Sequence, residues 1–338
     1  MNVGAPGKLF LAGEYGVLDG GTAVVTAVDR RVVARLADAG LAPAPTPVVA
    51  EVLSAVRAHC QARGVAMPAG TPVIDSASLS EDGRKLGLGS SAAVAAAATG
   101  ALLAAAGLPV EDDPETVFAL ADAAHRASQG GRGSGADVAA AVLGGVIAFA
   151  RTGGTATFRR LEARPAFEPV VISAGSPSVT VDHVRAVERL AARDPRTHAR
   201  RLQEIRDAAL AFLRAHEGAD GAALVTAVAA AHAALEALGH DADLPIVTPP
   251  LAAAAALARE IGGAAKPSGA GGGDVGVAFF ADPDAARGFR RRAAALELRI
   301  LDIKTGARGL ARGDVASGED GLCPASPIAG GSEPVRGF

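Results

Sequence analysis

Lysine is rare in this chain of 338 residues, in which arginine supplies almost all of the 33 Lys and Arg residues. The first three lysines each lie beside a glycine-containing segment, whereas the fourth follows the last expected strand and has no predicted role. An ammonium group is compact and movable, so it suits a phosphate where the wide guanidinium fork does not fit. The pattern therefore predicts phosphate chemistry at three segments. The lysines are Lys8, Lys85, Lys266 and Lys304.

The segment that contains Lys85 has the sequence KLGLGSSAA over residues 85–93 and opens an alanine-rich helix expected over residues 90–106. Backbone amides at the start of a helix bind phosphate, and glycines allow a close approach. The segment is not a Walker motif, because no Gly-Lys-Ser/Thr follows the required spacer. The hydroxyl groups of Ser90 and Ser91 can cap the helix, which is the simple alternative, or be offered to Mg²⁺.

Two other segments also contain a lysine near glycine residues. Residues 5–15 have the sequence APGKLFLAGEY, in which a turn precedes an apolar strand with Lys8 at its beginning. Residues 266–274 have the sequence KPSGAGGGD, which we expect to form a glycine-rich loop before an apolar strand. The alternatives are a solvated surface lysine in the first segment and a flexible connector in the second.

A fourth segment, residues 125–137, has the sequence HRASQGGRGSGAD and precedes a short apolar helix. Asp137 at its end is a candidate carboxylate for orienting a nucleophile or supporting Mg²⁺. The alternative is that Asp137 only caps the helix. The other histidines show no HxxxH or HExxH spacing, so no zinc site is predicted from them.

The elements expected around these segments mix helices and strands without regular βαβ alternation, which favours the α+β class. Two neighbouring strands are expected on either side of Asp29 and Arg30. A domain boundary is expected near residue 165, and a disordered tail from residue 311. The expected helices cover residues 49–63, 90–106, 113–128, 137–143, 181–193, 197–216, 221–238, 250–261 and 283–296. The expected strands cover residues 22–28, 31–36, 72–74, 146–150, 169–173, 275–280 and 298–303.

Composition excludes several classes of protein. A net charge of -3 argues against nucleic acid as the main partner, and 49% hydrophobic residues are enough for a core. Cys60 and Cys323 cannot make a disulfide framework, and no CxxC pair is present. No signal-peptide stretch opens the chain and the most apolar segment, residues 92–106, is too short to span a bilayer, so we expect a soluble cytoplasmic protein.

Taken together, the four segments resemble the GHMP kinases, a family of small-molecule kinases named for galactokinase, homoserine kinase, mevalonate kinase and phosphomevalonate kinase. The match covers roughly residues 3–310, with weak similarity in the helices after Thr180. Within the family, residues 74–76, 125–140 and 173–180 are most similar to the phosphomevalonate kinases. The connection over residues 38–48 is shorter than in many relatives, and the alanine-rich middle is hard to align. The family motifs match Pro6-Gly7-Lys8 with Gly13-Glu14-Tyr15, then residues 87–93, then residues 269–273.

The resemblance implies a two-domain GHMP kinase fold. Residues 1–165 would form an ATP-binding domain like ribosomal protein S5 domain 2, and residues 166–310 a ferredoxin-like domain, followed by the tail over residues 311–338. ATP and substrate would bind in the cleft between the domains, with Mg²⁺ as the second cofactor. The implied partner is a phosphorylated mevalonate, with no nucleic acid and no membrane, and the protein would be a monomer or a homodimer.

The resemblance also implies roles for individual residues. Lys8 and Asp137 would be catalytic, and Ser91 would bind the metal. Asp137 would orient substrate and metal more than remove a proton, because a phosphate acceptor is already mostly ionised at pH 7. The implied ATP-binding residues are Lys85, Gly87, Leu88, Gly89, Ser90 and Ser91. The implied substrate-binding residues are Glu14, Tyr15, Arg132, Ser134, Gly269, Ala270 and Gly271.

Three other interpretations remain open at this point. The chain could be a mevalonate kinase or another kinase of the family, although Asp274 and the segment before Asp137 argue against it. A related decarboxylase fits the intact motif around Lys8 poorly. A non-catalytic nucleotide-binding module would have no need to keep Lys8, Ser91 and Asp137 together.

Overall fold

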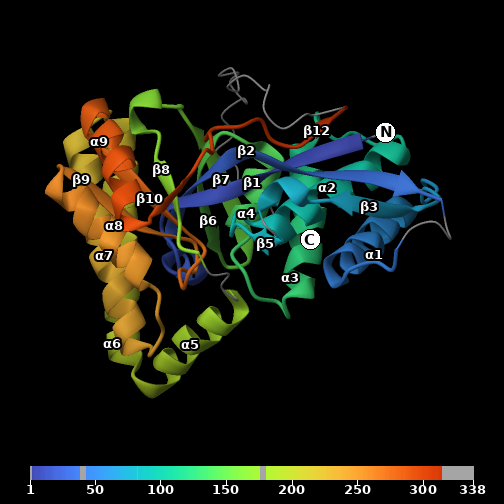
Figure 1. Cartoon of the computed structure of the whole chain (residues 1–338). Helices are drawn as coiled ribbons and strands as arrows, with labels where there is room; N and C mark the ends of the chain where they lie inside the picture. Colours follow the sequence, from blue (N-terminus) through green and yellow to red (C-terminus); the bar gives the residue numbers. More distant parts are fainter. Residues whose placement is uncertain (1, 39–42, 82, 176–179, 314–338) are drawn as a thin grey trace. The chain divides into compact units, whose positions relative to one another are not determined.

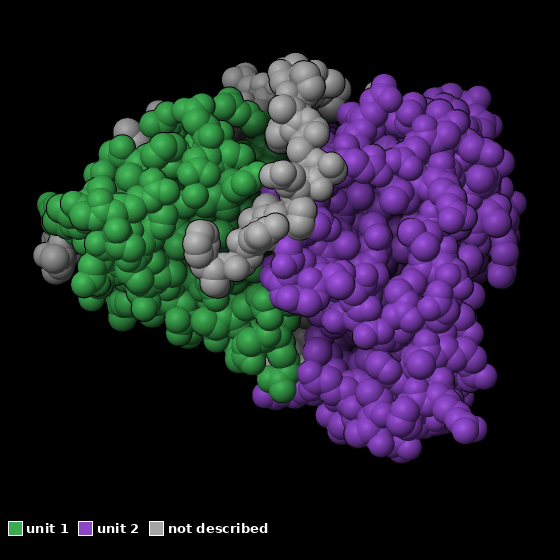
Figure 2. Space-filling view, turned by 180° about the vertical axis from the view of Figure 1, so that it is seen from behind, with its two compact units in different colours: residues 1–8, 26–147, 306–338 green, residues 9–25, 148–305 purple. Residues whose placement is uncertain are grey.

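The computed structural model describes residues 2–38, 43–81, 83–175 and 180–313. It consists of two compact units, each discontinuous in sequence (Figure 2). Unit 1 contains residues 1–8, 26–147 and 306–338, and unit 2 contains residues 9–25 and 148–305. Residues 9–25 therefore group with the second half of the chain. The domain limits expected at residues 165 and 310 remain a prediction.

One six-stranded sheet has the strand order β12-β1-β2-β6-β7, with β3 paired to β2 (Figure 1). Strands β1, β2 and β6 each contain residues of both units. Strand β3 pairs with β2 in antiparallel fashion, and so does β12 with β1. The strands are β1 (Asn2–Ala12), β2 (Thr22–Ala37), β3 (Thr71–Asp75), β6 (Val146–Thr152), β7 (Thr155–Leu161) and β12 (Ala311–Arg312).

Three predictions for this sheet are wrong. The two strands expected around Asp29 and Arg30 are the single strand β2, because no glycine or proline turns the chain there. Strand β7 was not expected, since its core-facing and solvent-facing residues alternate only over a short, arginine-containing edge strand. Residues 311–312, expected in the tail, pair with Val3 and Gly4. The rest of the expected tail, residues 314–338, lies outside the described residues.

Four helices expected in unit 1 are confirmed with nearly the same ends, and they pack against one another (Figure 1). Helix α2 contains seven buried alanines, whose small side chains allow neighbouring helices to approach closely. Asp113 caps α3 by accepting a hydrogen bond from the Thr116 amide at 3.1 Å, and Pro114 occupies the first turn. The helices are α1 (Pro47–Ala62), α2 (Ser90–Ala105), α3 (Pro114–Ser128) and α4 (Ala136–Leu143).

A short hairpin precedes α2 in unit 1 and was not expected from the sequence. It consists of β4 (Ser80–Glu81) and β5 (Arg84–Lys85), in which Ser80 faces Lys85. The hairpin therefore places Lys85 directly before the glycine-containing segment. Single-turn 3₁₀-helices occur at η1 (Gly16–Asp19), η2 (Ala77–Leu79), η3 (Pro165–Phe167) and η4 (Ala294–Leu296).

Unit 2 contains an antiparallel sheet in the order β11-β8-β10-β9. Helices α8 and α9 pack on it, and α5 and α7 both contact α6 (Figure 1). The antiparallel sheet with helices packed on it agrees with the expected α+β class. The strands are β8 (Val170–Ser173), β9 (Gly263–Ser268), β10 (Val275–Phe280) and β11 (Arg299–Leu301). The helices are α5 (Thr180–Arg193), α6 (Pro195–Glu217), α7 (Gly221–Asp241), α8 (Pro249–Glu260) and α9 (Pro283–Ala293).

Strand β9 corrects the prediction of a loop beginning at Lys266. All residues from Gly263 to Ser268 are buried, and each pairs with a residue of β10. The sequence GAAKPS lacks the β-branched and aromatic residues that are typical of a strand. Its residues can be small because side chains of the neighbouring strand β10, such as Phe280, fill the space beside them. A side chain at Gly263 would collide with the ring of Phe280. The glycine-rich loop is therefore confined to the residues between β9 and β10.

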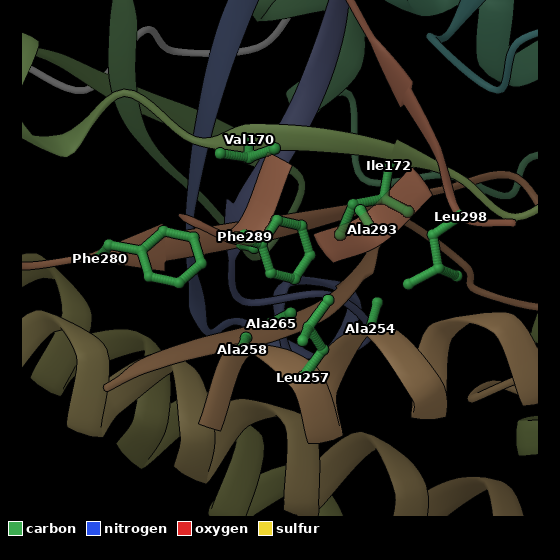
Figure 3. Close-up of a cluster of buried hydrophobic side chains, with 11 residues drawn as sticks. Val170, Ile172, Ala254, Leu257, Ala258, Ala265, Phe280, Phe289, Ala293 and Leu298 are labelled. Carbon is green, nitrogen blue, oxygen red and sulfur yellow. The ribbon is translucent and has the colours of Figure 1, made fainter. Parts of the chain in front are cut away.

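One core cluster of unit 2 lies between its sheet and the helices α8 and α9 (Figure 3). Phe289 of α9 is fully buried, and its ring centroid lies 5.3 Å from that of Phe280. Such a tilted aromatic pair adds a geometric preference to the burial of apolar surface. The cluster consists of Val170, Ile172, Ala254, Leu257, Ala258, Ala265, Ala278, Phe280, Phe289, Ala293 and Leu298.

Among the described residues, α7 is the one helix long and apolar enough to cross a membrane by length and composition alone. It packs against α6, β9 and β10, and its buried positions include Leu224, Val228, Leu235 and Leu238. These positions recur at helical spacing, which gives α7 a continuous packing face. The contacts make α7 a core helix of unit 2.

We predict that Phe289→Ala lowers the free energy of unfolding by about 3–5 kcal/mol, because the substitution leaves a cavity in a closed cluster. The matched control is Leu296→Ala, since Leu296 is 50% exposed in η4. We expect the control to change the free energy by no more than about 0.5 kcal/mol. Urea unfolding followed by circular dichroism measures both variants. Equal effects for the two would contradict the position of Phe289 in the core.

Candidate active site

Lys8 lies against the glycine-containing segment before α2, as expected. Its backbone amide donates to the Leu88 carbonyl at 2.8 Å. Its side chain is 7% exposed and passes so close to Gly89 that a Cβ there would lie 2.8 Å from Lys8 Cε. Gly89 also has a φ of 74°, a left-handed conformation that favours glycine. The structure thus brings together two of the predicted site segments, and glycine at position 89 leaves room for Lys8.

The beginning of α2 has no side-chain cap. Gly89 occupies the N-cap position, so Ser90 and Ser91 lie in the first turn and neither caps the helix. The first amides of a helix have no partner within the helix and lie at the positive end of its dipole. Amides in this position suit an anion such as phosphate. The capping role that the sequence left open for the two serines is therefore not observed.

Ser91 contacts His125, which in turn contacts Gln129, and neither of these two was predicted as a site residue. Its Oγ lies 3.0 Å from Nε2 of His125, which in turn lies 2.9 Å from Nε2 of Gln129. His125 lies in α3 and is only 2% exposed, whereas Ser91 is exposed. The sequence did contain a signal that His125 and Gln129 lie side by side, because residues four positions apart share one face of a helix.

Asp137 lies in the first turn of α4 and is not its N-cap, a position occupied by Gly135. Its Oδ1 accepts a hydrogen bond from the Val138 amide at 2.9 Å, and the residue is half-buried. Ser134 Oγ accepts from the Ala136 amide at 3.2 Å. The carboxylate is therefore held at the start of α4 by a first-turn amide, although Asp137 is not the N-cap residue. Its predicted catalytic role stays a prediction.

The other predicted residues of unit 1 lie around this group. Lys85 is exposed at the end of the β4–β5 hairpin, directly before the segment. Arg132 is half-buried in the loop between α3 and α4, which also contains Ser134. Their predicted roles, Lys85 at ATP and the other two at substrate, remain predictions.

Unit 2 contains a buried ion pair between Lys266 and Glu14. The side chains are 0% and 1% exposed, and the Lys266 ammonium donates to Glu14 Oε1. The same ammonium also donates to the Pro267 carbonyl at 2.9 Å. Lys266, expected beside a phosphate, is thus used inside the protein. The pair joins the first and third motifs, which lie 252 positions apart in sequence.

Two further hydrogen-bonded links run beside this ion pair. Ser268 Oγ accepts from the Phe10 amide at 2.9 Å and donates to the Phe10 carbonyl at 3.0 Å. The Tyr15 hydroxyl donates to the Ala270 carbonyl at 2.6 Å. Burial, reinforced by the charge of Glu14, raises the pKa of Tyr15 above its ordinary value, so the hydroxyl keeps its hydrogen. Residues 10–15 therefore hold the strand and loop at residues 266–270 from one side.

The glycine-rich loop between β9 and β10 is fixed by its neighbours. Nδ1 of His183 lies 3.0 Å from the Ala270 carbonyl, and its ring lies where a side chain at Gly272 would be. The Gly272 amide donates to the Ile246 carbonyl at 3.0 Å. The contacts argue against a flexible connector.

The predicted substrate residues of unit 2 are all found at these links or in the loop. Glu14 and Tyr15 are buried and bonded to other parts of unit 2. The loop residues Gly269, Ala270 and Gly271 connect β9 to β10. A structural role in shaping the loop follows directly for Glu14 and Tyr15. Contact of these five residues with a substrate remains a prediction.

Comparison with known proteins places the chain in a family. The model for the GHMP kinases N terminal domain matches residues 51–145, and the model for the GHMP kinases C terminal matches residues 223–296. The phosphomevalonate kinase of Streptomyces sp. (strain CL190) is 34% identical over 342 residues, covering 84% of this chain and 90% of the relative. This chain belongs to the GHMP kinase family. The resemblance of its motifs is thereby confirmed.

Solved structures confirm the fold of this GHMP kinase. The crystal structure of a Lin0012 protein from Listeria innocua is 27% identical with a TM-score of 0.82, covering 92% of this chain and 99% of that chain. The phosphomevalonate kinase of Streptococcus pneumoniae, solved in complex with phosphomevalonate and AMPPNP, is 22% identical with a TM-score of 0.79. It covers 90% of this chain and 99% of that chain. The predicted two-domain α+β fold of the family is therefore confirmed.

We predict that Lys266→Met lowers the free energy of unfolding by about 3–5 kcal/mol, because it leaves the Glu14 carboxylate buried without its cation. The double variant Lys266→Met/Glu14→Met removes both charges and should regain most of that loss. Urea unfolding of the wild type, both single variants and the double variant gives the coupling energy. Additive effects of the two substitutions would contradict a buried ion pair.

Proposed function

We propose that this GHMP kinase transfers the γ-phosphoryl group of ATP to phosphomevalonate and forms diphosphomevalonate. The 34% identity to a phosphomevalonate kinase over most of both chains supports this acceptor. The observation that carries the phosphoryl-transfer chemistry is the uncapped start of α2 with the Lys8 side chain beside it. An oxygen of the acceptor's phosphate would form a bond to the γ-phosphorus, and the bond to the leaving ADP oxygen would break.

The proposed ATP phosphates bind at residues 87–91. The amides at the start of α2 would donate to phosphate oxygens, and the helix dipole would favour their negative charge. Lys8 would stabilise the charge on the transferred group, which is the main requirement of phosphoryl transfer. Lys85 would contact the nucleotide from the adjoining hairpin.

Mg²⁺ is the proposed second cofactor, carried on the ATP phosphates. The described residues contain no group of three or more His, Cys, Asp or Glu that could hold a metal ion. A cation carried by a nucleotide does not require such a group, because Mg²⁺ is commonly held by one or two protein groups together with substrate phosphates and water. Ser91 would supply a hydroxyl oxygen, and Asp137 a carboxylate for substrate or metal. The ion would neutralise charge on the phosphates.

The acceptor determines what Asp137 has to do. A phosphate monoester has a second pKa of about 6, so it is mostly ionised at pH 7 and needs no strong base. An alcohol acceptor such as that of mevalonate would have to lose a proton. We infer that Asp137 orients the acceptor and the metal. Arg132 and Ser134 suit the acceptor's phosphate, since a guanidinium group binds phosphate through two parallel hydrogen bonds.

Unit 2 would contribute its glycine-rich loop to substrate binding. The links from Glu14 and Tyr15 give residues 269–271 a fixed shape, which lowers the entropy cost of binding. We propose that the loop contacts the substrate through its backbone. We also propose that the protein is cytoplasmic, acts on small molecules, and is a monomer or a homodimer.

A coupled assay of ADP release with mevalonate, phosphomevalonate and diphosphomevalonate, run in parallel, tests the acceptor. We expect turnover with phosphomevalonate alone, because its ionised phosphate matches the proposed site. Turnover with mevalonate alone would instead identify a mevalonate kinase, the main alternative within the family. Release of CO₂ from diphosphomevalonate would identify a decarboxylase.

We predict that Lys8→Met lowers kcat by about 10²–10³-fold, because it removes a positive charge from the transferred group. The affinity for ATP should change little, since the backbone amides of α2 remain. Lys304→Met is the matched control, because Lys304 is exposed and has no assigned role. Steady-state kinetics and nucleotide titration measure the two effects. A Lys8→Met enzyme as active as the control would refute the assignment.

A further inference from the structure

Ser91, His125 and Gln129 form a hydrogen-bonded group in unit 1. Nε2 of His125 lies 3.0 Å from Ser91 Oγ and 2.9 Å from Gln129 Nε2. His125 is buried, whereas Ser91 is exposed in the first turn of α2. The imidazole therefore contacts, from inside the protein, a hydroxyl group that is open to a ligand.

We assign directions to these two hydrogen bonds from their partners. With the amide nitrogen of Gln129 placed against Nε2 of His125, the amide donates and Nε2 accepts. In the same assignment the Ser91 hydroxyl donates to Nε2, so the two donors share its one lone pair.

A serine hydroxyl has one hydrogen and two lone pairs. Because its hydrogen is directed at His125, Ser91 presents only lone pairs to a ligand. A phosphate oxygen needs a donor and gains nothing from such a group, whereas a cation needs an oxygen that accepts. The neighbouring amides of α2 supply the donors for phosphate. The geometry thus separates two tasks at adjacent positions of one helix turn.

We propose that His125, held by Gln129, is a positioning residue that turns the Ser91 hydroxyl oxygen towards the Mg²⁺ ion of the bound nucleotide. Partners of metal ligands commonly act in this way, by fixing the orientation of the ligating group. The proposal rests on the proposed function only in requiring a kinase that binds Mg²⁺-nucleotide, and it holds for any acceptor. A purely structural role, in which the group only joins α2 to α3, predicts different results.

The test is calorimetric titration of ADP, once with Mg²⁺ and once with EDTA. The ratio of the two dissociation constants reports how much the metal strengthens binding, without any turnover. We expect His125→Phe to lower this ratio by about 10-fold or more. The dissociation constant in EDTA should stay within about twofold, because the amides of α2 are unchanged. His125→Gln should restore part of the ratio, since its Oε1 can accept at the reach of Nε2.

Three further variants make the test specific. Ser91→Ala should lower the ratio as much as His125→Phe, and the double variant should lower it no further. Gln129→Leu removes the donor that orients the imidazole, and it should act in the same direction even if His125→Phe does not fold. His59→Phe in α1 is the matched control and should leave the ratio unchanged.

The outcomes separate this proposal from the proposed function. Additive effects of the Ser91 and His125 substitutions, or equal losses with Mg²⁺ and with EDTA, would overturn the positioning role. So would a ratio in His125→Phe like that of the wild type. A wild-type protein that does not bind ADP at all would instead refute the proposed function and this inference with it.

Discussion

The ammonium group of Lys266 and the carboxylate of Glu14 meet where neither side chain is reached by solvent. Removing two charges from water costs several kcal/mol for each ion, and their attraction offsets this only when the geometry is good. The pair is therefore weak evidence for stability. It is better evidence for position, because Lys266 in any other register would leave a buried carboxylate without a partner.

That constraint determines the shape of the glycine-rich loop in unit 2. With Lys266 and Glu14 paired, Ser268 meets the backbone of Phe10, and the Tyr15 hydroxyl reaches the Ala270 carbonyl. Every second residue from Lys266 to Ala270 is thus hydrogen-bonded to a residue of the segment over residues 5–15. Glycines usually make a loop costly to order. Here the ordering takes place during folding, so a ligand does not have to supply it.

The sequence predicted the helices of unit 1 well because their signals are local. Asp113 and Pro114 mark the start of α3, and the structure confirms both. Strand β9 could not be predicted in this way, because its small residues are buried by pairing with β10 and by the neighbouring Phe280. Strand β2 was divided in two at Asp29 and Arg30, since charged residues in mid-strand resemble a turn when no partner strand is known.

The residues of the candidate site also differ in whether a local sequence signal identifies them. Lys8 and the segment over residues 87–91 were predicted because lysine beside glycine and serine at a helix start suits anion binding, and the structure places the two side by side. His125 and Gln129 were missed as site residues, because a histidine four residues before a glutamine occurs on many helices. Only the position of Ser91 beside them gives the spacing a meaning, and that position depends on how α2 and α3 pack.

The rarity of lysine now has two physical explanations in place of one. Lys8 fits the original argument, since its slender stem passes over Gly89 where a guanidinium fork would need more room. Lys266 requires lysine for a different reason. The partners of its ammonium include one carboxylate oxygen and one carbonyl oxygen, which suit a compact cation, whereas an arginine would have to place five N–H donors in the same buried position. Lysine thus occupies positions where a guanidinium group does not fit. Only the structure distinguishes a lysine at the candidate site, Lys8, from one in a buried ion pair, Lys266.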